Sequence, residues 1–277
     1  MRSDVVETRY SSRKWVWVRE LLLIAICYSC YSWVRNQFGS ASVTSDTAYR
    51  NADYMIETER FFGLYFEPTL QSWFDSWVWF LRFWNIFYGT LHFVVTLGVL
   101  IYLFLRASDE YRKWRTIGLL TTGLALIGFA LFPLMPPRLL GNCREVGACI
   151  DSPYIDTMAE YGGLWSFDSG LMESLSNQYA AMPSLHFAWA LWSWLAIRKH
   201  ITTKFGRFAI ASYPPLTLFA IVVTANHYWI DALGGVVVLG VAHYLGVRLI
   251  SWFDSVTLRT RICLLYTSDA ADDGVGV

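Results

Sequence analysis

The sequence predicts an all-α, polytopic membrane protein in which six transmembrane helices form a bundle. Hydrophobic residues make up 55% of the 277 positions, and the mean hydropathy is +0.35. Charged residues fall to 16%, whereas about a quarter of an ordinary soluble domain is charged. The apolar residues also gather into long runs, and about 20 of them in a helix cross a hydrocarbon core of ~30 Å.

Six apolar runs are the predicted spans. The first is flanked by basic residues and lacks a small-residue cleavage site, so we expect an anchor rather than a cleaved signal. Residues 60–76 are apolar but interrupted by Pro68 and several charges, which indicates an interfacial or re-entrant segment. The predicted spans are residues 15–35, 78–105, 115–135, 184–199, 207–224 and 228–252.

We expect residues 1–262 to form a single integral membrane domain, with its core at about 55–250. The string from Cys263 to Asp272 resembles a translated sequencing adapter, so residues 263–277 are expected to be a non-native tail. Cys143 and Cys149 lie six residues apart in a loop, where a disulfide or two free thiols are both compatible with the sequence.

The placement of basic residues predicts the orientation. Sixteen of the 22 Lys and Arg residues lie at the two ends of the chain or in the links after the second and fourth spans. By the positive-inside rule, both termini then face the cytoplasm, and the loops 36–76 and 136–183 face the other side. The net charge is zero, so nothing indicates a nucleic-acid partner.

Three polar stretches meet at the outer face in this topology. They are Phe132-Pro-Leu-Met-Pro-Pro-Arg138, Ala181-Met-Pro-Ser-Leu-His186 and Thr224-Ala-Asn-His-Tyr-Trp-Ile-Asp231. Each follows or precedes a different predicted span. Their convergence makes this face the candidate active site.

The residue types in these stretches suit phosphoryl transfer. His227 and Asp231 are four apart, so a helix places them on one face, where the carboxylate fixes the imidazole tautomer. Ser184 can cap a helix whose free N–H groups favour an anion, with His186 beside it. Arg138 follows two prolines and can bind phosphate oxygens in a bidentate manner.

The motifs Pro183-Ser-Leu-His186 and His227-x-x-x-Asp231 resemble the second and third signatures of the type 2 phosphatidate phosphatase superfamily. The Pro-Pro-Arg and Asn-His-Tyr-Trp-Ile-Asp contexts are most similar to its inositol phosphorylceramide synthase branch. The resemblance covers roughly residues 55–250. It includes the stretches Glu59-Arg-Phe-Phe-Gly, Tyr88-Gly-Thr-Leu-His92 and Tyr111-Arg-Lys-Trp-Arg115.

The resemblance implies a lipid phosphotransferase, or inositolphosphotransferase, of a plasma membrane such as that of a bacterium. His227 would attack phosphorus and form a phosphohistidine that Asp231 orients. His186 would protonate the departing alcohol and then activate the acceptor, an alcohol or water. Arg138, with Ser184 at the helix start, would bind the phosphate. The implied partners are a membrane lipid phosphate and the bilayer, and no cofactor or metal is required.

The chain departs from the family at two cationic positions. Leu131 stands where the fuller first motif has a Lys, and Ile221 stands where the third motif has an Arg. These losses fit the transferase-like branch. Arg60 and Arg144 are candidates to supply further positive charge on the same side.

Other interpretations remain open from the sequence. A phospholipid or polyprenyl-diphosphate phosphatase differs only in using water as acceptor. The two histidines and the aspartate are also zinc-ligand types, or they can form a network that merely caps helices. A non-catalytic lipid-binding or transport protein needs the spans but not the histidines. His92 and His243 lie in mid-span, which is typical of packing residues. His92 also lies in a stretch that resembles the family, so a supporting role beside the site is a second option for it.

Overall fold

The computed structural model describes residues 18–37 apart from 21, 24 and 35, then 45–141, 152–164 and 178–272, with side chains up to Val256. Throughout these ranges the regular elements are helices, and one isolated bridge joins Leu134 to Ala180. The predicted all-α class is confirmed for this part of the chain. The described residues among 18–37 are helical. The helices that follow are α2 (Ser45–Phe61), α3 (Glu67–Ser72), α4 (Val78–Arg106), α5 (Ser108–Leu131), η1 (Pro137–Leu139), α6 (Thr157–Tyr161), α8 (Leu185–Ile197), α9 (Lys204–Val223) and α10 (Trp229–Asp272).

Four of these helices are long and apolar enough to cross a membrane: α4, α5, α9 and the stretch Trp229–Val256 of α10. They correspond to four of the six predicted spans. The predicted span 184–199 is the 13-residue helix α8, which at 1.5 Å per residue extends about 20 Å. The first run, 15–35, lies partly outside the described residues. The count of six is therefore not confirmed.

Local signals account for where the helices begin and end. Ser184 caps α8 by accepting a hydrogen bond from the N–H of Phe187, and Thr203 caps α9 in the same way. Helix α5 begins earlier and ends earlier than the predicted span 115–135. It stops at Leu131 because Pro133 follows, and the residue before a proline avoids the helical conformation.

The segment predicted as interfacial contains the end of α2 and the short helix α3. Pro68 lies in the first turn of α3, where its missing N–H costs no hydrogen bond. Aromatic side chains on either side of it, including Phe61 and Trp73, are exposed. Exposed aromatic rings of this kind are typical of a membrane interface.

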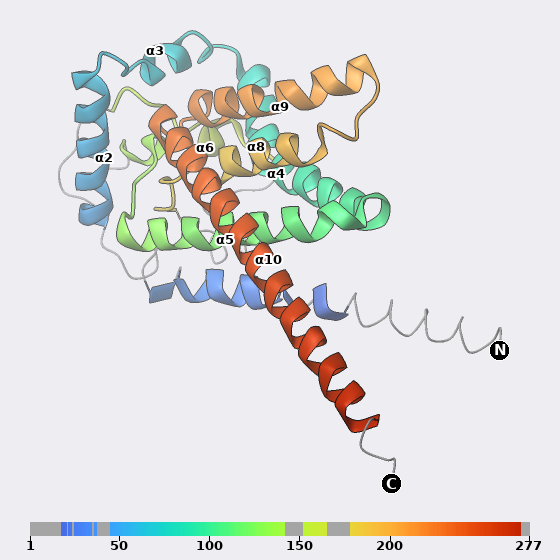
Figure 1. Cartoon of the computed structure of the whole chain (residues 1–277). Helices are drawn as coiled ribbons and strands as arrows, with labels where there is room; N and C mark the ends of the chain where they lie inside the picture. The colour runs from blue at the N-terminus through green and yellow to red at the C-terminus, as the bar shows by residue number, and fades with distance from the viewer. Residues whose placement is uncertain are drawn as a thin grey trace.

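Helix α8 packs against α4, α5, α9 and α10, while α10 runs across α5 and α8 (Figure 1). Trp192 of α8 is buried, and its indole N–H donates to the carbonyl of Trp114 on α5. At Gly235 of α10, an added Cβ would lie 2.6 Å from the carbonyl oxygen of Ser184. This close approach brings the start of α8 next to the start of α10.

Candidate active site

The turn between α9 and α10 holds His227. The N–H groups of Asn226 and His227 both donate to the carbonyl of Ile221, at 3.1 Å each. Ala225 has φ of 53°, a left-handed conformation that costs about 1–2 kcal/mol for a residue with a Cβ. The turn closes tightly in this way and directs the imidazole of His227 inward, where the residue is only 3% exposed.

His227 has a defined tautomer. Its Nδ1 lies 2.9 Å from the carbonyl oxygen of Ala181 and 3.2 Å from Oδ2 of Asp231. A carbonyl oxygen only accepts, so Nδ1 must carry the hydrogen and donate it. The lone pair of the imidazole is then on Nε2. This is the arrangement that a nucleophilic histidine needs.

Asp231 is fully buried and tied to the first turn of α10. Its Oδ2 accepts from the backbone N–H of Tyr228, at 3.0 Å, as well as from His227. The carboxylate at the third helical position therefore reaches back to the residue before the helix, as in a capping box. Both contacts hold Asp231 where it supports the imidazole.

His186 lies at the beginning of α8, and its ring centre is 5.6 Å from that of His227. Two residues of α4 enclose it. Tyr88 stacks on the ring at 4.2 Å, and His92 contacts it edge to face, also at 4.2 Å. The Nδ1 of His92 lies 2.9 Å from the carbonyl oxygen of Tyr88. His92 was expected to be a packing residue, and the structure places it against the candidate acid.

Backbone hydrogen bonds join the three predicted stretches. The N–H of Ser184 donates to the carbonyl of Asp231 at 2.8 Å, and the N–H of Arg138 donates to the carbonyl of Ala225 at 2.8 Å. Ser184 is fully buried, and its hydroxyl is used in capping α8. The stretches that carry Arg138, His186 and His227 are therefore fixed to one another by main-chain atoms.

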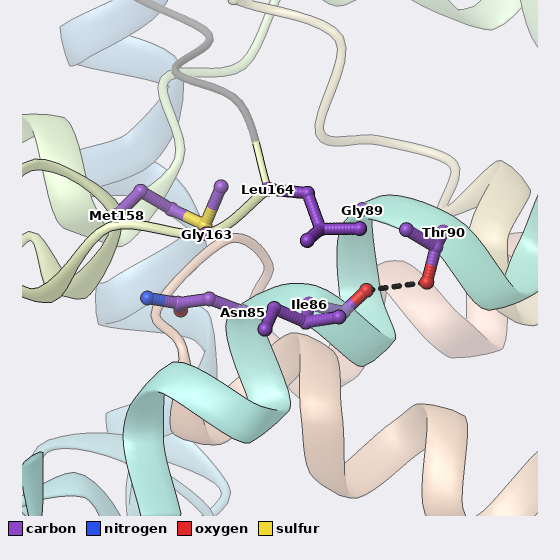
Figure 2. A pocket seen from close by; sticks show the side chains of 7 residues that line it. All are labelled: Asn85, Ile86, Gly89, Thr90, Met158, Gly163 and Leu164. Atoms are coloured by element: carbon purple, nitrogen blue, oxygen red, sulfur yellow. Dashed lines mark hydrogen bonds between the residues drawn. The ribbon is translucent and has the colours of Figure 1, made fainter. Parts of the chain in front are cut away.

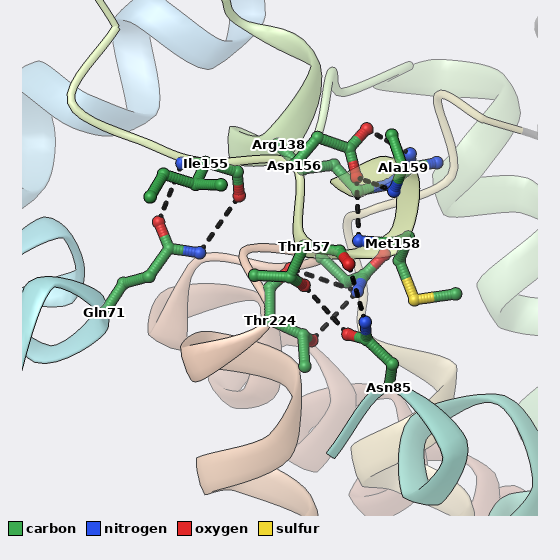
Figure 3. Close-up of polar contacts among 10 residues, drawn as sticks. Gln71, Asn85, Arg138, Ile155, Asp156, Thr157, Met158, Ala159 and Thr224 are labelled. Carbon is green, nitrogen blue, oxygen red and sulfur yellow. Dashed lines mark hydrogen bonds and ion pairs between the residues drawn. The ribbon is translucent and has the colours of Figure 1, made fainter. Parts of the chain in front are cut away.

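Arg138 lies in η1 and is 6% exposed. Its guanidinium forms a 2.9 Å ion pair with Oδ2 of Asp156, whose other oxygen accepts from the N–H groups of Met158 and Ala159 at the start of α6 (Figure 3). Next to it, Thr157 donates to the side chain of Asn85 on α4. A carboxylate thus contacts the arginine that the sequence assigns to phosphate.

Two small clefts border this region. The first has room for about one water molecule and is lined by His186 and His92 together with mainly apolar side chains such as Phe87, Tyr213 and Ile221. The second is a shallow depression between α4 and the chain from α6 to Leu164, lined by residues such as Asn85, Met158 and Leu164 (Figure 2). The first cleft opens beside His186 and His92.

The structure brings together four residues selected from the sequence: Ser184, His186, His227 and Asp231. The fifth, Arg138, is joined to them through its backbone N–H, and its guanidinium contacts Asp156. Sequence reasoning assigned no role to Tyr88 or Asp156, although Tyr88 belongs to a stretch that resembled the family. Of the extra cations considered, Arg60 contacts Glu57 and stacks over Tyr65. Arg144, Cys143 and Cys149 lie outside the described residues.

The zinc interpretation requires at least three suitable side chains around one point. In the described ranges, no group of three His, Cys, Asp or Glu residues is arranged to hold a metal ion. In addition, Nδ1 of His227 is already shared between a carbonyl and Asp231. The geometry resembles an oriented nucleophile more closely than a ligand cage.

Searches of curated proteins and of solved structures found no match. A family model described as PAP2 superfamily matches residues 53–245. This range exceeds half of the chain and contains the stretches that carry Arg138, His186, His227 and Asp231. The family comprises phosphatase-type enzymes. The chain therefore belongs to the PAP2 superfamily.

Proposed function

We propose that the protein is a membrane-embedded lipid phosphotransferase that works through a phosphohistidine on His227. Membership of the PAP2 superfamily supports phosphatase or phosphotransferase chemistry. The observation that carries the proposal is the tautomer of His227, which presents Nε2 as the nucleophile while Ala181 and Asp231 hold Nδ1.

The reaction proceeds in two displacements. Nε2 of His227 attacks phosphorus, the bond to the leaving alcohol breaks, and His186 gives that oxygen a proton. An acceptor hydroxyl then loses its proton to His186, attacks phosphorus and releases His227. Arg138 neutralises charge on the phosphoryl oxygens and must first exchange Asp156 for the substrate. In both displacements, residues of the protein provide the acid, the base and the cation.

An alcohol acceptor is favoured over water by the surroundings of His186. Tyr88 and His92 cover its ring, and the adjoining cleft is lined mainly by apolar side chains. The covering rings and the apolar lining limit the access of bulk water to His186. A phospholipid or polyprenyl-diphosphate phosphatase, in which water takes the acceptor position, is the second candidate. We place the site at the extracytoplasmic face, with both termini cytoplasmic.

The test uses purified protein, phospholipid labelled at phosphorus, and an added alcohol such as inositol or a second lipid alcohol. A labelled phosphodiester of the acceptor supports transfer, whereas a water-soluble phosphate product alone supports the phosphatase. His227→Ala is expected to abolish both products and the labelled enzyme intermediate. His243→Ala is the matched control, because His243 lies further along the same helix against Trp114. Full activity of His227→Ala would refute the proposal.

A further inference from the structure

Two buried glutamates receive the first N–H groups of α10. The N–H of Trp229 donates to Oε1 of Glu67 at 3.2 Å, and the N–H of Ile230 donates to Oε1 of Glu59 at 3.4 Å. Both glutamates are fully buried. The first N–H groups of a helix have no partner within the helix, so buried ones need an external acceptor. Glu59 and Glu67 provide it from the end of α2 and the start of α3.

The same segment holds α10 by a further contact. The indole N–H of Trp229 donates to the carbonyl of Leu64, between the two glutamates, at 3.0 Å. Oε2 of Glu67 accepts from the N–H of Phe66 at 3.0 Å. The chain from Glu59 to Glu67 therefore binds the N-terminus of α10. It includes the stretch Glu59-Arg-Phe-Phe-Gly, which resembles the family but has no role in the chemistry above.

The two carboxyl groups differ in their contacts. Both oxygens of Glu67 accept from backbone N–H groups, which suits an ionised carboxylate. Only Oε1 of Glu59 does so. In the described part of the chain Oε2 of Glu59 has no hydrogen-bond partner, and Glu67 is close enough to act electrostatically on the Glu59 carboxyl group. A proton on Glu59 turns this oxygen into a donor to Glu67 and removes the repulsion between two buried charges.

The electrostatic surroundings agree with that proton. Burial, followed by the charge of Glu67, raises the pKa of Glu59 far above its ordinary value. Asp231 adds a third buried carboxyl group nearby. The other titratable groups facing this cluster are Tyr65, Tyr154 and Tyr228, with Arg60 over the ring of Tyr65.

We propose that Glu59 and Glu67 are positioning residues for the active site, acting as a carboxylic acid and carboxylate pair that seats the start of α10. The pair occupies the N–H groups of Trp229 and Ile230, so Asp231 remains bound to His227 and to the N–H of Tyr228. Without the pair, those two N–H groups would compete with the N–H of Tyr228 for the carboxylate of Asp231, which lies in the same helical turn. The inference rests on the function proposed above.

The contacts predict an asymmetry between two conservative variants. Glu59→Gln keeps one accepting oxygen for Ile230 and supplies an amide N–H to Glu67, so kcat should stay within about twofold of wild type. Glu67→Gln turns an amide N–H toward a backbone N–H, so kcat should fall about tenfold or more with little change in KM. Glu57→Gln is the control. Glu57 lies on α2, like Glu59, but it is exposed, so kcat and KM should both stay unchanged.

A pH series provides a readout that simple loss of packing would not give. A raised pKa in the fold stabilises the protein at low pH, and this stabilisation is lost as the pH rises through the raised value. Wild type should therefore lose activity and thermal stability at alkaline pH, and Glu59→Gln should lose less of both. Thermal unfolding of the purified protein, measured without substrate, records the second property independently of turnover.

The outcomes separate the two proposals. If wild type transfers or hydrolyses no phospholipid, the proposed function fails, and the unfolding series alone decides on the glutamate pair. If wild type is active but Glu59→Gln loses as much kcat as Glu67→Gln, the shared proton is refuted. Equal alkaline melting curves for wild type and Glu59→Gln refute it as well. Unchanged kcat in Glu67→Gln would show that the pair does not position Asp231.

Discussion

Replacing Asp231 by Asn tests how His227 is oriented. The change removes a buried negative charge while keeping an oxygen that can accept a hydrogen bond. In serine proteases the corresponding change lowers kcat by about 10⁴-fold, because the histidine then adopts the wrong tautomer. Here the carbonyl of Ala181 lies 2.9 Å from the same Nδ1 and accepts only. The productive tautomer of His227 should therefore persist in Asp231→Asn.

The expected loss is then the value of one charge-assisted hydrogen bond. Such a bond contributes about 1.5–3 kcal/mol, and each ~1.4 kcal/mol changes a rate tenfold. We expect the phosphohistidine to form about 10- to 150-fold more slowly in Asp231→Asn. The substrate KM should change little, because Asp231 is fully buried and contacts His227 rather than solvent.

The assay is single-turnover formation of labelled enzyme, quenched in alkali because phosphohistidine is labile to acid. A loss near 10⁴-fold would refute the reasoning, since it would show that Ala181 does not hold the tautomer. An unchanged rate would show that the charge of Asp231 has no part in the attack. The melting temperature of Asp231→Asn, measured in parallel, distinguishes a slower reaction from a less stable fold.

Two further substitutions test the packing and the electrostatics of the site. Gly235→Ala should lower the free energy of unfolding by about 1–3 kcal/mol and reduce activity, because the added Cβ would lie 2.6 Å from a carbonyl oxygen. Gly240→Ala is the control: the space around Gly240 is open, so the melting temperature and turnover should not change. Asp156→Asn keeps an oxygen for the helix cap but weakens the ion pair to Arg138. The guanidinium is then easier to release to an anionic lipid, so KM should fall. A raised KM would show that Asp156 assists binding.

Hydrophobic runs predicted four long helices well, because length and composition alone identify such segments. The start of α8 was predictable as well, since Ser184 is a local capping signal. The length of α8 was not. Its apolar run continues to Ile197, and the charges that follow end it at a length of about 20 Å. Whether a short apolar helix spans, tilts or is enclosed depends on its neighbours, which the run itself does not encode.

The residues of the site that lie close together in sequence were also predictable. His227 and Asp231 are one helical turn apart, so their contact follows from spacing. Glu59 and Glu67 contact α10 across a sequence separation of more than 160 residues. The hydropathy pattern identifies them only as charges that interrupt an apolar segment. The pairing of Arg138 with Asp156 was hidden for a similar reason, because the two residues are 18 positions apart in the sequence.

Hydrogen bonds of main-chain atoms hold the site together, and this affects which substitutions the site can tolerate. The N–H groups of Arg138 and Ser184, and the carbonyl of Ala181, are present whatever side chains those positions carry. Only proline, which lacks an N–H, would delete the first two bonds. Most substitutions at these positions would therefore leave the orientation of His227 unchanged, and the side chains around the cleft could vary to change which substrate is bound.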